Sequence, residues 1–159
     1  TPGQGTTFHV FLPRYGIPFP SSTQTATLSS PKSSAETILL VEDEPAILTM
    51  TQNMLRRQGY TVLAAGSSSE AIRLAQDHAG KIDLLITDVV MPEMNGRDLA
   101  RTMQSICPNI KRLFMSGHTA DVLANHGMLD AGVHFVQKPF TRKLLMDKIL
   151  EALEIQHPA

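Results

Sequence analysis

Residues 84–96 read LLITDVVMPEMNG, a short apolar run that ends at a carboxylate and continues into two turn signals. The apolar run is too short to cross a membrane and has the length of a strand that is buried on both faces. Met-Pro and Asn-Gly then end the regular structure, because the residue before proline avoids helical angles and glycine tolerates most others. We therefore expect Asp88 at the carboxyl end of a strand. In open parallel α/β sheets, ligands bind outside those ends, although a lone Asp more often caps the next turn.

The sequence around this stretch alternates strand signals with helix signals from residue 36 onward. Short apolar runs predict strands at 37–41, 60–65, 84–88, 111–115 and 133–137. Helix starts are indicated by Pro45, by the capping box Ser67–Glu70, and by the potential caps Asn95 and Thr141. A short, weakly patterned helix is expected over roughly 120–127.

Apolar side chains recur at helical spacing within these segments. The sets are Ile47, Met50 and Met54; Ala71, Leu74 and Ala75; Leu99, Met103 and Ile106; and Leu145, Ile149 and Ala152, the last set being expected to face inward. Five strand and helix pairs imply a parallel sheet with helices on both faces, because parallel neighbours need crossover connections. Right-handed crossovers favour the doubly wound α/β form.

Polar side chains stand at the ends of four of the five expected strands. Glu42 and Asp43 follow the first strand, Asp88 ends the third, Ser116 follows the fourth, and Lys138 follows the fifth. Each has an ordinary explanation by itself, as a solvated end charge, a turn residue or a surface lysine. Together they would crowd three carboxylates and one ammonium group into one crevice, which is unfavourable unless a cation joins them. Oxygen ligands with room for water suit Mg²⁺.

The composition of the 159-residue chain sets further limits. A hydrophobic content of 42% can bury one good core, so we expect one domain plus some additional sequence. The net charge of -1 and the absence of Trp argue against a nucleic-acid partner. Cys107 is the only cysteine, which excludes an internal disulfide. Without a membrane-length apolar run or a signal peptide, we expect a soluble cytoplasmic segment with no membrane contact of its own, whatever anchor the full-length protein has.

The first 35 residues differ in kind from the rest. Residues 1–20 hold a Gly turn and an alternating strand pattern, and residues 21–35 have the Ser/Thr/Pro-rich composition of a flexible linker. A single strand cannot fold alone, so the chain is expected to be cut from something longer. The segments Pro2–Phe8 and Leu12–Arg14 resemble the last glycine box and final strand of the ATP-binding domain of sensor histidine kinases. Residues 1–20 are therefore interpreted as a remnant of that catalytic domain.

A more extensive resemblance covers residues 36–157. It is carried by four motifs in order and at suitable spacing: Val41–Glu44, Asp88–Gly96, Met115–Gly117 and Lys138–Phe140. These motifs resemble those of the receiver domain of response regulators. The resemblance implies a flavodoxin-like, five-stranded parallel sheet of order 2-1-3-4-5 with helices on both faces.

The same resemblance implies a phosphoacceptor and a metal site. Asp88 would be the phosphoacceptor, and Mg²⁺ would be bound by Asp88, by Asp43 directly, by Glu42 through water, and by the Val90 backbone carbonyl. Glu42 departs from the family pattern, in which Asp is more frequent. Its longer side chain leaves its link to the metal open.

Phosphoryl contacts and a switch are implied in the same way. Ser116 and Lys138 would bind phosphoryl oxygens and complete the catalytic set with Asp88. Gly117, lacking a side chain, would let its amide approach the phosphoryl group. Phe135 matches the aromatic switch residue, which could fill the space left when Ser116 moves toward the new dianion.

The resemblance predicts a phosphorelay receiver at the end of a hybrid sensor histidine kinase, similar to the cell-cycle hybrid kinases of alphaproteobacteria. Its partners would be a histidine kinase domain and a histidine phosphotransfer protein, and it would catalyse only its own phosphorylation and dephosphorylation. Two alternatives stay open: the receiver of a DNA-binding response regulator without its output domain, and a phosphate-independent interaction module of the same fold. A hydrolytic phosphatase is disfavoured, because Val90 stands where its second Asp is expected.

Overall fold

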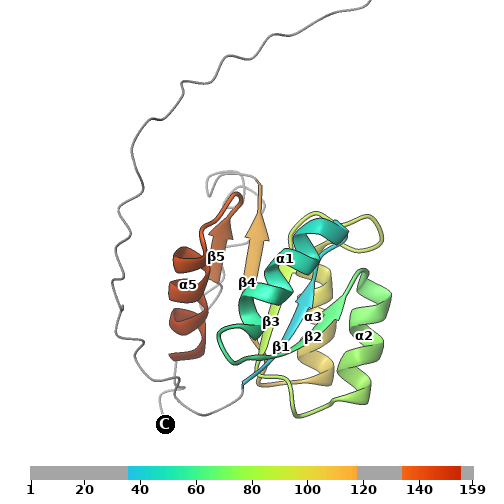
Figure 1. Cartoon of the computed structure of the whole chain (residues 1–159). Coiled ribbons are helices and arrows are strands. Elements are labelled where there is room, and N and C mark those ends of the chain that lie inside the picture. The colour runs from blue at the N-terminus through green and yellow to red at the C-terminus, as the bar shows by residue number, and fades with distance from the viewer. Residues whose placement is uncertain (1–35, 118–133, 155–159) are drawn as a thin grey trace, which may run out of the picture. The chain divides into compact units, whose positions relative to one another are not determined.

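A computed structural model of the chain describes residues 36–117 and 134–154. Figure 1 shows a sheet flanked by helices in this part of the chain. The helix expected over 120–127 lies outside the described residues, as do the predicted kinase remnant at 1–20 and the predicted linker at 21–35.

Five parallel strands form one sheet in the order β2-β1-β3-β4-β5. Their bounds are β1 Thr37–Val41, β2 Thr61–Ala65, β3 Leu84–Asp88, β4 Lys111–Ser116 and β5 His134–Gln137. The prediction of a doubly wound, flavodoxin-like sheet with this order is confirmed. Because all five strands run in the same direction, their carboxyl ends meet at one edge of the sheet.

Four helices lie within the described residues: α1 Pro45–Arg56, α2 Ser68–Asp77, α3 Gly96–Ile106 and α5 Arg142–Glu154. Three of them begin at side-chain caps that the sequence indicated. The side chains of Ser67, Asn95 and Thr141 each accept a hydrogen bond from the amide three residues further on, which satisfies an amide that the helix itself leaves without a partner. None of the four combines the length and the apolar character that a bilayer-spanning helix needs.

The helices cover both faces of the sheet, α2 and α3 on one side and α1 and α5 on the other. Successive strand residues point to opposite faces, so Leu39 and Leu85 pack beneath α2 and α3, while Leu40 and Ile86 pack beneath α1 and α5. The inward-facing set predicted for the last helix is confirmed, with all three side chains buried: Leu145, Ile149 and Ala152. β1 and β3 therefore contribute side chains to the hydrophobic cores on both faces of the sheet.

Helix α1 has apolar side chains on two faces, and the helically spaced set noted in the sequence is not the one that is most deeply buried. Leu55 and Thr51 are fully buried against the sheet, whereas Met50 is 45% exposed. Ile47 and Met54, which share the spacing of Met50, are only partly buried. We call Ile47, Met50 and Met54 the outer stripe of α1. The sheet is covered by a different set of α1 side chains.

These two faces of α1 predict unequal effects of truncation. Leu55→Ala should lower the free energy of unfolding by about 2–5 kcal/mol, because it removes fully buried apolar surface and leaves a cavity. Met50→Ala, on the outer stripe, should lower it by less than about 1 kcal/mol. Urea unfolding followed by circular dichroism measures both changes. Equal losses would contradict this assignment of the two faces.

Candidate functional site

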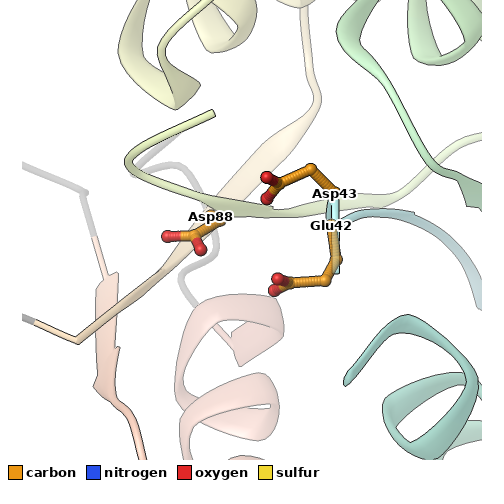
Figure 2. Close-up of side chains that lie close together, drawn as sticks. All are labelled: Glu42, Asp43 and Asp88. Atoms are coloured by element: carbon orange, nitrogen blue, oxygen red, sulfur yellow. The ribbon is translucent and has the colours of Figure 1, made fainter. Parts of the chain in front are cut away.

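Three carboxylates converge at the carboxyl edge of the sheet. Glu42 and Asp43 directly follow β1, and Asp88 is the last residue of β3. These strands are neighbours, with Val41 in register with Thr87, so the residues after them lie side by side. One ligand atom from each carboxylate lies within 4.8 Å of the others, and Figure 2 shows the three side chains around a common space. The structure thus brings together the three acids that the sequence placed at the ends of strands.

Lys138 reaches the same cluster from the end of β5. Its Nζ lies 2.7 Å from Asp88 Oδ2 and 2.5 Å from Glu42 Oε2, so one ammonium group donates to two carboxylates that end different strands. Its backbone amide donates to the Ser116 carbonyl at 2.7 Å. The lysine is therefore fixed at both ends, by its backbone to β4 and by its side chain to β1 and β3.

Burial and charge compete in the protonation of this pair. Glu42 is only 1% exposed, and burial raises the pKa of its carboxyl even though the Lys138 ammonium group acts to lower it. For Lys138, burial by itself would lower the pKa, but the hydrogen bonds and charges of Asp88 and Glu42 together outweigh burial and raise it. The ammonium form of Lys138 is thus stabilised by its two acidic partners.

The donor set of the cluster fits a divalent cation. Three carboxylates and one ammonium group leave a formal excess of two negative charges, and Asp43 is exposed to solvent at the rim. Carboxylate oxygens with access to water are the ligands that Mg²⁺ prefers. Lys138 already donates to Glu42 and Asp88. Asp43 and the Oδ1 atom of Asp88, which Lys138 does not contact, are therefore the best placed to hold a metal.

The remaining predicted site residues lie around this cluster. Ser116 ends β4, between the strands that carry Asp88 and Lys138, and is 1% exposed. Among residues 36–117 and 134–154, no atom lies within 4 Å of a Cβ atom added to Gly117. Val90 is 62% exposed, and its amide donates to Asp88 Oδ1 at 3.4 Å.

Phe135 lies one layer beneath the site. It is partly buried in the core under α3 and stacks on Phe114, with ring centroids 5.5 Å apart. Phe135 pairs in register with Phe114, and Ser116 with Gln137, so the aromatic ring and the serine belong to adjacent strands. The proposed switch pair is therefore held by the same two strands.

Two residues that fix the Asp88 backbone were not singled out by the sequence pattern. The Thr87 hydroxyl donates to the Asp88 carbonyl at 3.0 Å. Gly96 lies so close that an added Cβ would stand 2.1 Å from the same carbonyl oxygen. The Asn-Gly signal indicated a turn and a helix cap, but the requirement for glycine comes from this tertiary contact, eight residues away along the chain.

Comparison with known proteins gives one family. Residues 38–150 match the family model described as the response regulator receiver domain. The sensor kinase CckA of Brucella abortus (strain 2308) is 37% identical over 161 residues, which cover 97% of this chain and 17% of that protein. The DNA-binding transcriptional regulator NtrC of Azospirillum brasilense is 35% identical over 125 residues, 79% of this chain and 26% of that protein. The chain thus spans about a sixth and about a quarter of these relatives.

Solved structures agree with this result. The crystal structure of the receiver domain from the hybrid histidine kinase CckA is 35% identical, with a TM-score of 0.64, and the match covers 74% of this chain and 99% of that one. A response regulator receiver protein from Sinorhizobium medicae WSM419 is 31% identical, with a TM-score of 0.67, covering 78% of this chain and 98% of that one.

The close approach of Gly96 predicts an effect opposite to helix propensity. Gly96→Ala would normally favour a helix by up to about 1 kcal/mol. Here we expect it to destabilise the fold by about 1–3 kcal/mol, because the added methyl group must displace the Asp88 carbonyl. Gly66→Ala is the matched control, since its Cβ would make only an ordinary contact at 3.9 Å. Urea unfolding gives the free energies, and amide chemical shifts of residues 87–90 report the displacement. A stabilised Gly96→Ala variant would refute this explanation.

Proposed function

The chain belongs to the response regulator receiver domain family, and on that premise we propose that Asp88 accepts a phosphoryl group from a phosphohistidine with the help of Mg²⁺ and Lys138. The chain is a receiver domain of two-component signalling, similar to the receivers of hybrid kinases. The observation that carries the assignment to Asp88 is its position at the end of the central strand, with Lys138 Nζ 2.7 Å from its carboxylate and two further acids beside it.

The proposed step is a displacement at phosphorus. One Asp88 carboxylate oxygen forms a bond to phosphorus while the bond between phosphorus and the histidine nitrogen breaks, and the imidazole leaves with the electron pair. The Lys138 ammonium group, which donates to the Asp88 carboxylate, would donate to the phosphoryl oxygens as negative charge develops on them. The Ser116 hydroxyl and the Gly117 amide would also donate hydrogen bonds to these oxygens. These donors come from strands β4 and β5, which flank the acceptor on one side.

Mg²⁺ would be held by residues at the ends of β1 and β3 and in the loop after Asp88. Asp43, Asp88 and the Val90 carbonyl are the proposed protein ligands, with Glu42 contributing through water. When bound, the ion would offset the repulsion between the acidic cluster and an anionic phosphoryl donor. One like-charge pair at about 4 Å costs on the order of 4 kcal/mol at an effective dielectric constant of about 20. The hydrogen bond from Lys138 to Glu42 supports an indirect role for Glu42, because one of its oxygens is already engaged.

We also propose that phosphorylation changes a protein-binding face. A new dianion at Asp88 would attract Ser116, and Phe135 would move into the space that the serine leaves. The Phe135 ring stacks on Phe114 at the edge of the core. This stacking defines the position from which the ring would move toward Ser116. The face concerned includes β5 and α5.

A hybrid sensor kinase is the proposed parent protein. The match to the sensor kinase CckA covers 97% of this chain, whereas residues 36–159 make up less than four fifths of it, so that similarity extends into residues 1–35. The match to NtrC covers 79%, about the length of the receiver alone. This difference supports the reading of residues 1–20 as a kinase remnant and 21–35 as a linker. A DNA-binding response regulator is correspondingly not favoured, and the site is proposed to work in the cytoplasm.

The outer stripe of α1 is the proposed contact for the phosphodonor or phosphoacceptor protein. Helix α1 begins at Pro45, two residues after Asp43, so a partner that brings a histidine to Asp88 must approach this end of the helix. Met50 is the most exposed member of the stripe, and Ile47 and Met54 extend the apolar surface along the helix. A histidine phosphotransfer protein or kinase helix with an apolar face would cover it.

The chemistry is tested with acetyl phosphate as donor. We expect Asp88→Asn to lose all phosphoryl labelling, because the amide keeps the shape but not the nucleophilic charge. Lys138→Ala should retain Mg²⁺ binding and label at least about a hundredfold more slowly, since a preorganised donor to the developing charge is gone. Mass spectrometry of the intact protein measures the label. Asp147→Asn, an exposed aspartate of α5 paired with Lys143, is the control that should label normally. Undiminished labelling of Asp88→Asn, or full labelling in EDTA, would reject the mechanism.

The partner surface requires a different donor. With a phosphorylated histidine phosphotransfer protein, Met50→Lys should reduce the transfer rate about tenfold, because it places a charge in an apolar contact. Acetyl phosphate labelling of the same variant should be unchanged. Gln76→Lys, which adds the same charge at an exposed position of α2, is the control that should transfer at the wild-type rate. Equal transfer rates for wild type and Met50→Lys would exclude the outer stripe as the contact.

A further inference from the structure

The loop between β3 and α3 is tied to the first turn of α2, far from it in the sequence. Glu93 Oε2 accepts two hydrogen bonds from Ser69, one from its hydroxyl at 2.6 Å and one from its backbone amide at 3.2 Å. The Ser68 hydroxyl donates to the Met94 carbonyl at 3.2 Å. We call these contacts the α2 clamp. They join two segments that are 24 to 26 residues apart.

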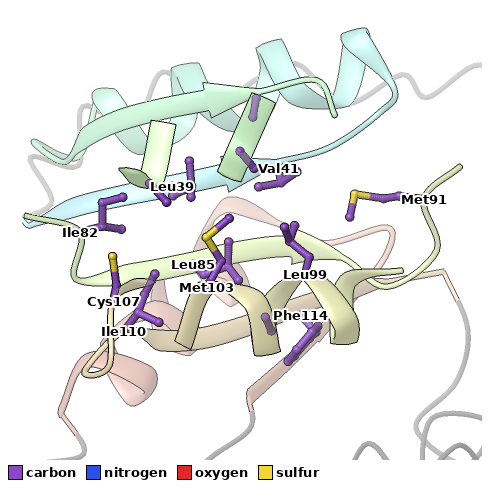
Figure 3. Packing of buried hydrophobic residues seen from close by; sticks show 14 of the residues in the cluster. Leu39, Val41, Ile82, Leu85, Met91, Leu99, Met103, Cys107, Ile110 and Phe114 are labelled. Atoms are coloured by element: carbon purple, nitrogen blue, oxygen red, sulfur yellow. The ribbon is translucent and has the colours of Figure 1, made fainter. Parts of the chain in front are cut away.

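The α2 clamp adds to anchors at the two ends of the same loop. At its start, the Val89 amide donates to the Met115 carbonyl at 3.0 Å, and at its end the Gly96 amide donates to the Val89 carbonyl at 2.9 Å. Between them, the Met91 side chain is buried in the core, as Figure 3 shows. Val90 is exposed, as are Pro92, Glu93 and Asn95, so side-chain burial holds none of these four positions and their placement depends on hydrogen bonds and on the buried residues between them.

Electrostatics favours the carboxylate at this place. The first amides of a helix lack intrahelical partners and carry a partial positive charge, so an acid beside them is stabilised. The hydrogen bonds from Ser69 lower the pKa of Glu93. Helix α2 already has a local cap, because Ser67 accepts from the Glu70 amide and Glu70 Oε2 accepts from the Gly66 amide. The helix therefore begins properly without Glu93, and the clamp acts mainly on the loop.

We propose that Glu93 and Ser69 are positioning residues for the acidic site: by fixing the loop after Asp88, they set the affinity of the site for its divalent cation. The proposal rests on the proposed function, in which the Val90 carbonyl is a metal ligand. The rigid core on the Asp88 side and the clamp on the far side leave the loop little freedom. Removing the clamp should leave the three carboxylates in place and impair only the contribution of the loop.

The test measures metal binding directly, with Mn²⁺ alone as the probe and electron paramagnetic resonance as the readout. Glu93→Ala should weaken Mn²⁺ binding about tenfold, the usual size of an effect that acts through a ligand's support. Glu93→Gln keeps an acceptor for both Ser69 donors and should restore most of the affinity. Ser69→Ala should weaken binding less, since its backbone amide still donates, and it should add little to Glu93→Ala in the double variant.

Glu70→Ala is the matched control. It removes an exposed glutamate from the same helix turn that caps only its own helix, so it should alter stability without altering Mn²⁺ affinity. Urea unfolding shows which variants are folded, and Ser69→Ala keeps the test decisive if Glu93→Ala does not fold. If the wild type and the clamp variants bind Mn²⁺ equally well, the positioning role of Glu93 and Ser69 is wrong and the proposed function stands. A wild type that neither binds Mn²⁺ nor labels at Asp88 would overturn both.

Discussion

The arrangement of the site depends on the pair of hydrogen-bonded ion contacts that the Lys138 ammonium group makes. This group donates to Asp88, the last residue of β3, and to Glu42, the residue after β1, while the lysine itself follows β5. An acidic cluster of this density would repel itself without a cation. The same lysine amide is bonded to the carbonyl of Ser116, so the carboxyl ends of β1, β3, β4 and β5 are connected through one residue. Chemistry and sheet geometry are thus coupled at this edge.

Much of the fold follows from short-range signals in the sequence. β1 and β3 have the predicted bounds, and the caps at Ser67 and Asn95 form as expected, because an apolar run or a capping side chain acts within a few residues. Helix α1 shows where such signals stop. Its 47–50–54 spacing is a valid helical stripe, yet the sheet packs against Thr51 and Leu55, and one sequence cannot rank two stripes on the same helix.

The site could be located from the sequence, but its contacts could not. Strand ends in a parallel sheet share one edge, which is why Glu42, Asp43, Asp88 and Lys138 could be grouped before any coordinates. That Lys138 donates to Glu42 depends on side-chain length and on residues 96 positions apart. The contact of Gly96 with the Asp88 carbonyl is likewise tertiary, and so is the bond between Glu93 and Ser69. Local patterns carry no information about such distances.

The place of β5 in the sheet has a consequence for how the domain responds. Within residues 36–117 and 134–154 this four-residue strand pairs with β4 alone, whereas β3 is paired on both sides. A short strand with one neighbour opens locally at a lower free energy than a central one. Lys138 therefore joins the central strand of the sheet to one of its two edge strands. Any change of charge at Asp88 alters its ion pair with Lys138 and so bears directly on the end of an edge strand, while β1, β3 and β4 each keep paired neighbours on both sides.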